Sequence, residues 1–250
     1  METNWNDFVD FYDWEFEFVC KEQSKDIYFW LKMANIYRDE ILEFGCGTGR
    51  ISLVLAKHDF KITAVDSAEK FLHKLNQKNT FKNLNTYLGD MTKFHINKNF
   101  NLIMFPYSTF QYLLTKEQQI TCLLNAKSLL KDNGRIIIDI SPHIAKGDSL
   151  TESIKLYSKW NSELQCQVSM YTSYVITGDI QYWEDDYIIT DKDSNESYFT
   201  HKIALKKTDM QEFIELCDEC NLIIENVYGS FDLKNITEES SNYLYVLKKG

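Results

Sequence analysis

Three of the nine glycines in this 250-residue chain fall within five positions, at Gly45, Gly47 and Gly49. They follow the apolar segment 40–44 and precede a segment of helical periodicity that begins near Arg50. A plain strand-to-helix turn needs one glycine, whereas several residues without a Cβ let the backbone approach a bound molecule closely. The cluster therefore predicts a strand that ends in a ligand-binding loop, at the start of an α/β fold.

The first half of the chain continues this alternation of strands and helices. Strands are predicted at 40–44, 61–65, 85–88, 100–105 and 135–140. Helices are predicted from 50 to 58, from a Ser67 cap to 77, and from Thr115 to the turn at Asn133–Gly134. Thr115 and Gln118 have the spacing of a capping box. Alternation of this kind predicts a doubly wound, parallel sheet.

The second half has a different pattern. Between 151 and 206 the chain is rich in Tyr, Thr, Val and Ile, with turn signals that predict an antiparallel meander. A helix is expected from Thr208, followed by strands at 222–228 and 242–247. We therefore expect lid helices in 1–38, an α/β core formed by 39–150 and 207–250, and an inserted antiparallel sheet in 151–206.

Charge and composition narrow the function classes. Lys and Arg number 27 against 37 Asp and Glu, a net charge of −10 that disfavours a chain built to grip nucleic acid. No stretch approaches the roughly 20 apolar residues of a membrane helix, and the first residues do not resemble a secretion signal. The expected setting is cytoplasmic, with the six cysteines as reduced thiols.

The spacing of the glycines separates two kinds of cofactor. A dinucleotide loop, G-x-G-x-x-G, would place its third glycine at position 50, which is Arg50. The sequence from Glu43 to Gly49 instead reads E-x-G-x-G-x-G, with Cys46 inside the loop. In this stretch the chain resembles the class I S-adenosylmethionine-dependent methyltransferases. The resemblance implies a Rossmann-like seven-stranded sheet whose last strand is antiparallel.

Residues after the next strands take their expected roles from this resemblance. Asp66, with Ser67, would accept the ribose hydroxyls of S-adenosylmethionine. Asp90 and Met91 would contact the adenine. Phe105 and Tyr107 would lie beside the transferred methyl group. Together with Glu43, Gly45, Cys46, Gly47 and Gly49, these are the residues expected at the cofactor.

Two residues are candidates for the chemistry. A hydroxyl acceptor needs a base, whereas an amine need only arrive neutral. His143 follows the fifth predicted strand, at the sheet edge where the methyl group is expected, and is the candidate base. Tyr12 lies in a Tyr-Asp pair that resembles the N-terminal lid of small-molecule methyltransferases, where the tyrosine approaches the methionine moiety.

No metal site is expected. Cys217 and Cys220 form a C-x-x-C motif near the end of a predicted helix, without the second pair that a zinc site needs. Asp90 and Asp139 end strands, as do the ligands of metal-dependent methyltransferases, but Asp90 already has an adenine role in the resemblance.

The inserted sheet resembles that of the sugar N-methyltransferase and glycine-type N-methyltransferase groups. There it forms the roof of a substrate cavity and in some cases a dimer face, so a homodimer through this sheet is plausible. The candidate substrate residues are Tyr107, Phe110, Tyr182, Trp183, His201 and Tyr228. We expect transfer of a methyl group to a nitrogen or oxygen of a small metabolite, with nitrogen favoured.

Three other functions stay open at this point. The first is methylation of a peptide or an RNA, the second a module that holds the cofactor without catalysis, and the third a nicotinamide oxidoreductase. The glycine spacing disfavours the last of these. The identity of the acceptor, the pathway and the oligomeric state do not follow from the sequence.

Overall fold

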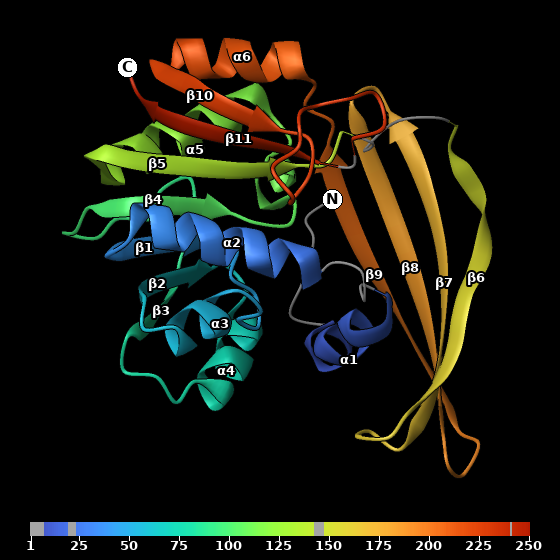
Figure 1. The fold of residues 1–250 in the computed structure, drawn as a ribbon. Helices are drawn as coiled ribbons and strands as arrows, with labels where there is room; N and C mark the ends of the chain where they lie inside the picture. The colour runs from blue at the N-terminus through green and yellow to red at the C-terminus, as the bar shows by residue number, and fades with distance from the viewer. Residues whose placement is uncertain (1–7, 20–23, 143–147, 241) are drawn as a thin grey trace.

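The structure, a computed structural model, describes residues 8–19, 24–142, 148–240 and 242–250. It contains a seven-stranded sheet and a separate four-stranded sheet, which stand beside each other with the first helix between them (Figure 1). The predicted fold class, a Rossmann-like α/β sheet with an inserted antiparallel sheet, is confirmed.

The seven-stranded sheet has the order β10-β11-β5-β4-β1-β2-β3. Its strands are β1 (Glu40–Phe44), β2 (Lys61–Asp66), β3 (Leu84–Leu88), β4 (Phe100–Phe105), β5 (Leu130–Ile140), β10 (Leu222–Tyr228) and β11 (Tyr243–Lys249). β11 is antiparallel to both of its neighbours, and the remaining pairs are parallel. The strand order reverses between β1 and β4, and ligands of open α/β sheets bind beyond the carboxyl ends at such a point.

Helices cover both faces of this sheet. On one side lie α2 (Ser24–Tyr37), α3 (Ser52–Lys57) and α4 (Glu69–Lys78), and on the other α5 (Lys116–Leu129) and α6 (Met210–Glu219). In β5, Ile136 and Ile138 pack into the core under α5 and α6, while Ile137 packs into the opposite core. This explains the unbroken apolar run, because neighbouring residues of a strand face opposite sides.

The end of α5 and the start of β5 differ from the prediction. The capping box of Thr115 and Gln118 is present, but α5 ends at Leu129 rather than at Asn133–Gly134. Leu130 is fully buried and pairs with Phe100, so β5 begins there and contains the glycine. Burial of one leucine in the sheet thus outweighs the local turn signal.

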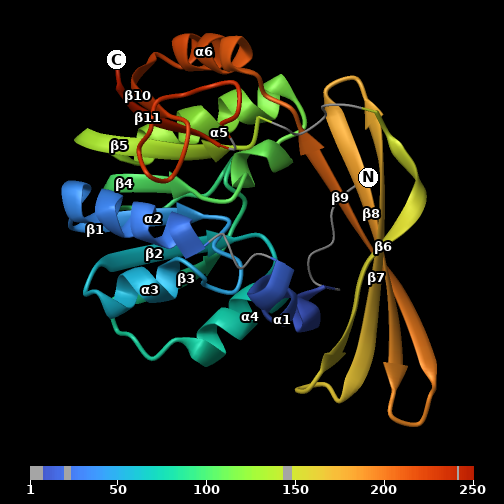
Figure 2. The same ribbon diagram turned by 45° about the vertical axis from the view of Figure 1, so that its right-hand side comes forward.

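The inserted sheet is a four-stranded antiparallel meander. Its strands are β6 (Leu150–Asn161), β7 (Cys166–Thr177), β8 (Ile180–Asp191) and β9 (Glu196–Lys206), in that spatial order (Figures 1 and 2). Gln111, in the short 3-10 helix η3 (Thr109–Tyr112), links this sheet to the core. Its side-chain amide donates to the carbonyls of Ser141 and Lys206, at 3.2 and 3.0 Å, and accepts the Ser141 N–H.

Helix α1 (Val9–Val19) fills the space between the two sheets (Figure 2). Phe8 and Phe11 pack against the inner face of the inserted sheet at Val168, whereas Val9 packs against Phe71 of α4. The helix therefore bridges the inserted sheet and α4, and the prediction that it acts as a lid stays open. Among the described helices, none is long and apolar enough to cross a membrane.

Candidate functional site

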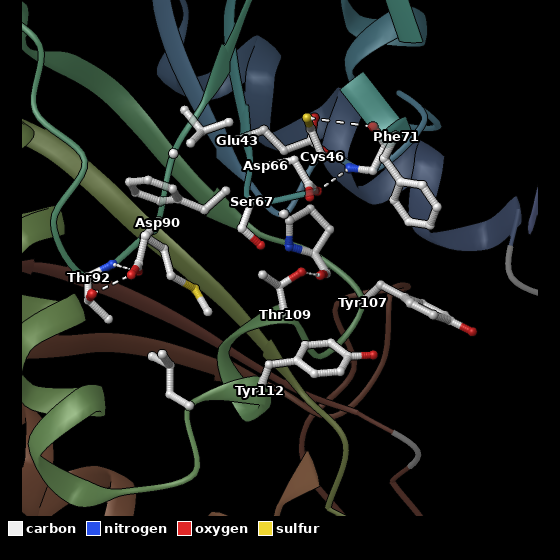
Figure 3. Close-up of a pocket in the computed structure, with 18 of the residues that line it drawn as sticks. Glu43, Cys46, Asp66, Ser67, Phe71, Asp90, Thr92, Tyr107, Thr109 and Tyr112 are labelled. Atoms are coloured by element: carbon white, nitrogen blue, oxygen red, sulfur yellow. Dashed lines mark hydrogen bonds between the residues drawn. The ribbon is translucent and has the colours of Figure 1, made fainter. Parts of the chain in front are cut away.

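A cavity of about 710 Å³ lies beyond the carboxyl ends of β1, β2, β3 and β4 (Figure 3). Its walls come from the glycine loop, the loops after β2, β3 and β4, and Tyr12 of α1. The inserted sheet contributes Ala204. The cavity occupies the place where open α/β sheets bind their ligands.

The three glycines of the loop all have left-handed backbones, with φ of 67°, 55° and 91° for Gly45, Gly47 and Gly49. A Cβ on Gly45 would lie 2.4 Å from Thr109 Cγ2, and one on Gly49 would lie 2.2 Å from Leu75 Cδ1. These two glycines therefore permit close packing within the protein. A Cβ on Gly47 would instead point into the cavity, so this glycine leaves room for a ligand.

Asp66 ends β2 and organises the floor of the cavity. Its carboxylate, labelled in Figure 3, accepts the N–H of Gly47 at 2.7 Å. It also accepts the N–H of Ala68 at 2.8 Å. Burial raises the pKa of Asp66 above its usual value, and the hydrogen bonds from these backbone N–H groups offset only part of that rise. Since each carboxylate oxygen can accept a second hydrogen bond, Asp66 retains capacity for ligand hydroxyls.

The start of α4 corrects one expectation about Ser67. The helix begins after Ala68, whose backbone N–H is satisfied by the Asp66 carboxylate rather than by a serine cap. Ser67 is exposed and lines the cavity. Ser67 therefore forms part of the cavity wall and does not cap α4.

Two buried side chains lie at the glycine loop, Glu43 at the end of β1 and Cys46 within the loop itself. Glu43 accepts a hydrogen bond from the hydroxyl of Ser52 in α3, and burial raises its pKa to about 8. The Cys46 thiol lies inside the loop, where burial raises its pKa well above the usual value. Both residues line the cavity. Cys46 is therefore a neutral wall group and not a thiolate nucleophile.

Asp90 and Met91 follow β3 and line the cavity. One Asp90 oxygen accepts both the N–H and the hydroxyl of Thr92, at 2.8 and 2.7 Å. Partial burial raises the pKa of Asp90, but these bonds and Lys93 lower it below the usual value. The carboxylate is therefore charged and held in place, as an acceptor for an amino group would be.

Aromatic rings form part of the cavity wall. Tyr107 of the loop after β4 and Tyr112 of η3 line it (Figure 3), as does Tyr12 of α1. The Tyr12 ring lies 4.9 Å from the ring of Phe71, which also lines the cavity. The sequence analysis missed Tyr112 and Phe71, because no motif marks the helix turns on which they lie.

Arg50 is a further residue that the sequence analysis did not assign to the site. Its guanidinium forms two hydrogen bonds with Asp26 of α2, at 2.7 and 2.6 Å, and lies 4.9 Å from the ring centroid of Phe16. Its position directly after the glycine motif was the available signal. This ion pair ties the glycine loop to α2, while the cation–π contact ties the loop to the lid.

Several expected site residues do not line the cavity. Phe105 and Phe110 are fully buried in the core, where they pack on each other and on Phe44 and Phe213. Their side chains follow the strand and 3-10 turn inward and do not reach the cavity, so their assignment to the cofactor and the substrate stays a prediction without support from this geometry. Tyr228 packs against the core beneath α2.

The residues expected in the substrate roof lie apart from the cavity as well. Tyr182, Trp183 and His201 are not among the described residues that line the cavity. His201 stacks on Phe8 at 4.6 Å, and Trp183 packs on Tyr174. Phe8, directly before α1, therefore covers the His201 ring. His143, the candidate base, lies outside the described residues.

A search of the described residues finds no group of three His, Cys, Asp or Glu side chains arranged to hold a metal ion. The five described cysteines are buried free thiols. Burial raises the pKa of Cys217 to about 12 and also raises that of Cys220. This C-x-x-C pair is therefore a packing feature of α6.

Comparison with known proteins agrees with this geometry. Residues 41–134 match the family described as "Methyltransferase domain". The cypemycin N-terminal methyltransferase of a Streptomyces species is 27% identical over 99 residues, which is 40% of each chain. The chain spans less than half the length of the curated relatives it matches.

Solved structures extend the likeness to nearly the whole chain. An S-adenosylmethionine-dependent methyltransferase from Clostridium acetobutylicum ATCC 824 has a TM-score of 0.84 at 16% identity, covering 98% of this chain and 100% of that one. The sugar N-methyltransferase KedS8 from Streptoalloteichus sp ATCC 53650 has a TM-score of 0.73 at 15% identity, covering 90% and 87%. Residues 41–134 are therefore similar to a methyltransferase domain, and the chain has the fold of the class I S-adenosylmethionine-dependent methyltransferases.

Proposed function

We propose that this protein transfers the methyl group of S-adenosylmethionine to an amine nitrogen of a small molecule. The observation that carries the proposal is a cavity whose wall combines the glycine loop and two strand-end carboxylates with aromatic rings. Asp66 and Asp90 line it together with Tyr12, Tyr107 and Tyr112. Structural relatives that include a sugar N-methyltransferase support nitrogen over oxygen.

The glycine loop and the two carboxylates fit this cofactor. The cofactor has two ribose hydroxyls, an adenine amino group and an amino-acid tail. Asp66 and Asp90 offer carboxylate oxygens for the hydroxyls and the amino group, and Gly47 leaves open the space that a Cβ would fill. Ser67, Cys46 and Met91 complete the wall.

Bound S-adenosylmethionine supplies an electrophilic methyl group on a sulfonium centre. The protein's part is to hold the acceptor nitrogen in line with that group and to exclude water. Helix α1 covers the cavity through Tyr12, while Tyr107 and Tyr112 offer aromatic faces on which a substituted amine can pack. The nitrogen lone pair forms the new bond to carbon, the electron pair of the carbon–sulfur bond goes to sulfur, and the resulting ammonium gives its proton to bulk water after the product leaves.

The first test is calorimetric titration with S-adenosylmethionine, S-adenosylhomocysteine and NAD in separate runs. Micromolar binding of the first two, and none of NAD, is expected. Release of S-adenosylhomocysteine is then measured with amino sugars, amino acids, short peptides, phenols and RNA. Turnover with small amines supports the proposal, whereas turnover with RNA or phenols alone overturns it. Cofactor binding without any turnover favours a binding module.

Removal of the Asp66 carboxylate is expected to weaken cofactor binding at least tenfold. Asp66→Ala loses the acceptor for ligand hydroxyls and also the two bonds that hold Gly47 and Ala68. Asp66→Asn keeps one oxygen and is expected to lie between the alanine variant and the wild type. Both affinities are measured by calorimetry. Unchanged affinity in Asp66→Ala removes this residue from the ribose site.

The remaining expectations from the sequence belong to this proposal. The inserted sheet exposes one broad face and is the proposed surface for a homodimer, which light scattering tests directly. A cytoplasmic setting and a small-molecule partner stay predictions of the same kind.

A further inference from the structure

Two consecutive residues after β4 have left-handed backbones although neither is glycine. Tyr107 has φ of 55° and Ser108 has φ of 58°. Side chains disfavour this conformation, and such residues persist only where the surrounding structure holds them. Tyr107 lines the cavity, so the strained turn lies at the site itself.

A buried carboxylate from the neighbouring strand holds this turn. One oxygen of Asp139, near the end of β5, accepts the backbone N–H of Tyr107 at 3.0 Å. The other oxygen accepts the side-chain amide of Asn242, just before β11, at 2.7 Å. Asp139 is 1% exposed and does not line the cavity. Three segments distant in sequence therefore meet at one side chain.

The turn determines where the Tyr107 ring lies. The ring makes an edge contact with Phe16 of α1, with centroids 5.7 Å apart, and the Arg50 guanidinium lies 5.6 Å from its centroid. In Figure 3 the Tyr107 and Tyr112 side chains point the same way from the loop and η3. A change in the backbone of Tyr107 would swing this ring away from both the lid and the glycine loop.

We propose that Asp139 is a positioning residue for methyl transfer, whose carboxylate holds the left-handed turn that presents the Tyr107 ring to the cavity. The inference rests on the proposed function for its kinetic consequence. Its structural consequence, the ordering of the Tyr107 amide, is independent of any reaction.

The first measurement is hydrogen exchange at the Tyr107 amide, without ligand. In the wild-type protein this amide should exchange at least a hundredfold more slowly than an unstructured amide. Asp139→Ala should speed its exchange at least tenfold, whereas Asp139→Asn, which keeps an acceptor oxygen, should stay within threefold of the wild type. Asp132→Ala, an exposed carboxylate near the other end of β5, is the matched control. An unprotected wild-type amide overturns the proposal even if Asp139→Ala does not fold.

The second measurement uses the best amine acceptor from the screen. Asp139→Ala should lower kcat at least tenfold and leave the Kd of S-adenosylmethionine within threefold. In a Tyr107→Ala background, Asp139→Ala should lower kcat less than twofold. The reason is that the effects of substitutions at residues that act as a unit do not add. The proposal is overturned if the losses of kcat in Asp139→Ala and Tyr107→Ala add in the double variant. It is also overturned if Asp132→Ala loses as much kcat as Asp139→Ala. If no acceptor is methylated, the proposed function fails while hydrogen exchange still decides the role of Asp139.

Discussion

Gly47→Ala is expected to fold and yet to bind S-adenosylmethionine at least a hundredfold more weakly than the wild-type protein. A Cβ on Gly47 would lie 3.7 Å from Phe71 and 4.0 Å from the Tyr12 hydroxyl, in the cavity where the loop backbone meets the ligand. The cost to folding is the left-handed backbone, about 1–2 kcal/mol. The cost to binding is larger, because the methyl group occupies ligand space.

Gly49→Ala provides the contrast within the same loop. Its Cβ would lie 2.2 Å from Leu75 Cδ1 and 3.1 Å from Leu53 Cγ, with φ of 91°. Overpacking and backbone strain together should lower the free energy of unfolding by about 3 kcal/mol. Thermal melts and calorimetry on both variants separate the two effects. Wild-type affinity in Gly47→Ala would contradict the placement of the ligand.

Glu15→Gln is expected to stabilise the docked lid above pH 7 and to reduce the pH dependence of stability. Glu15 lies on α1, is 8% exposed and accepts the Tyr187 hydroxyl at 2.9 Å. Burial raises its pKa to about 7, with Asp185 adding to the rise. Glutamine keeps an oxygen for Tyr187 and carries no charge to bury.

The direction in which stability changes with pH follows from proton binding to Glu15. Between pH 4.5 and 7 the folded state binds the Glu15 proton more tightly than the unfolded state does, so stability falls as the pH rises. Across this pH range the free energy of unfolding falls by about 3 kcal/mol, at roughly 1.4 kcal/mol per unit of difference between the folded and unfolded pKa. Asp185, whose pKa burial raises to about 6, acts in the same direction.

Two measurements at pH 5.5 and 8 check this prediction, because stability of the whole chain and protection of α1 are separate quantities. Thermal melts report the whole chain, and hydrogen exchange over 9–19 reports the helix. Glu17→Gln, an exposed change on the same helix, is the control and should behave as the wild type. Equal pH dependence in wild type and Glu15→Gln would show that Glu15 is not a buried acid.

The sequence predicted the parts of the fold that depend on local pattern. The strands at 100–105 and 222–228 have the expected bounds, since their apolar runs are short and flanked by polar turns. The glycine spacing located the cavity, because three left-handed residues in five positions suit few other purposes. Asp66, Asp90, Met91, Tyr107 and Tyr12 all line it.

The failures have a common cause. Phe110 was expected at the substrate and lies in the core, whereas Tyr112, two residues later, lines the cavity. The local pattern shows that aromatic rings lie near the site, but the direction of each ring depends on the rotation of the 3-10 turn. The roof residue His201 likewise meets α1, which sequence alone did not place against the sheet.

The sequence by itself determined the parallel sheet, the inserted meander and the ligand loop, because hydrophobic period and glycine position are properties of neighbouring residues. The tertiary structure alone decided which side chains face the cavity. Asp139 acquires its role from Tyr107, 32 positions earlier, and from Asn242, 103 positions later. Contacts of this kind arise from the packing of whole elements, and no periodicity in the chain records them.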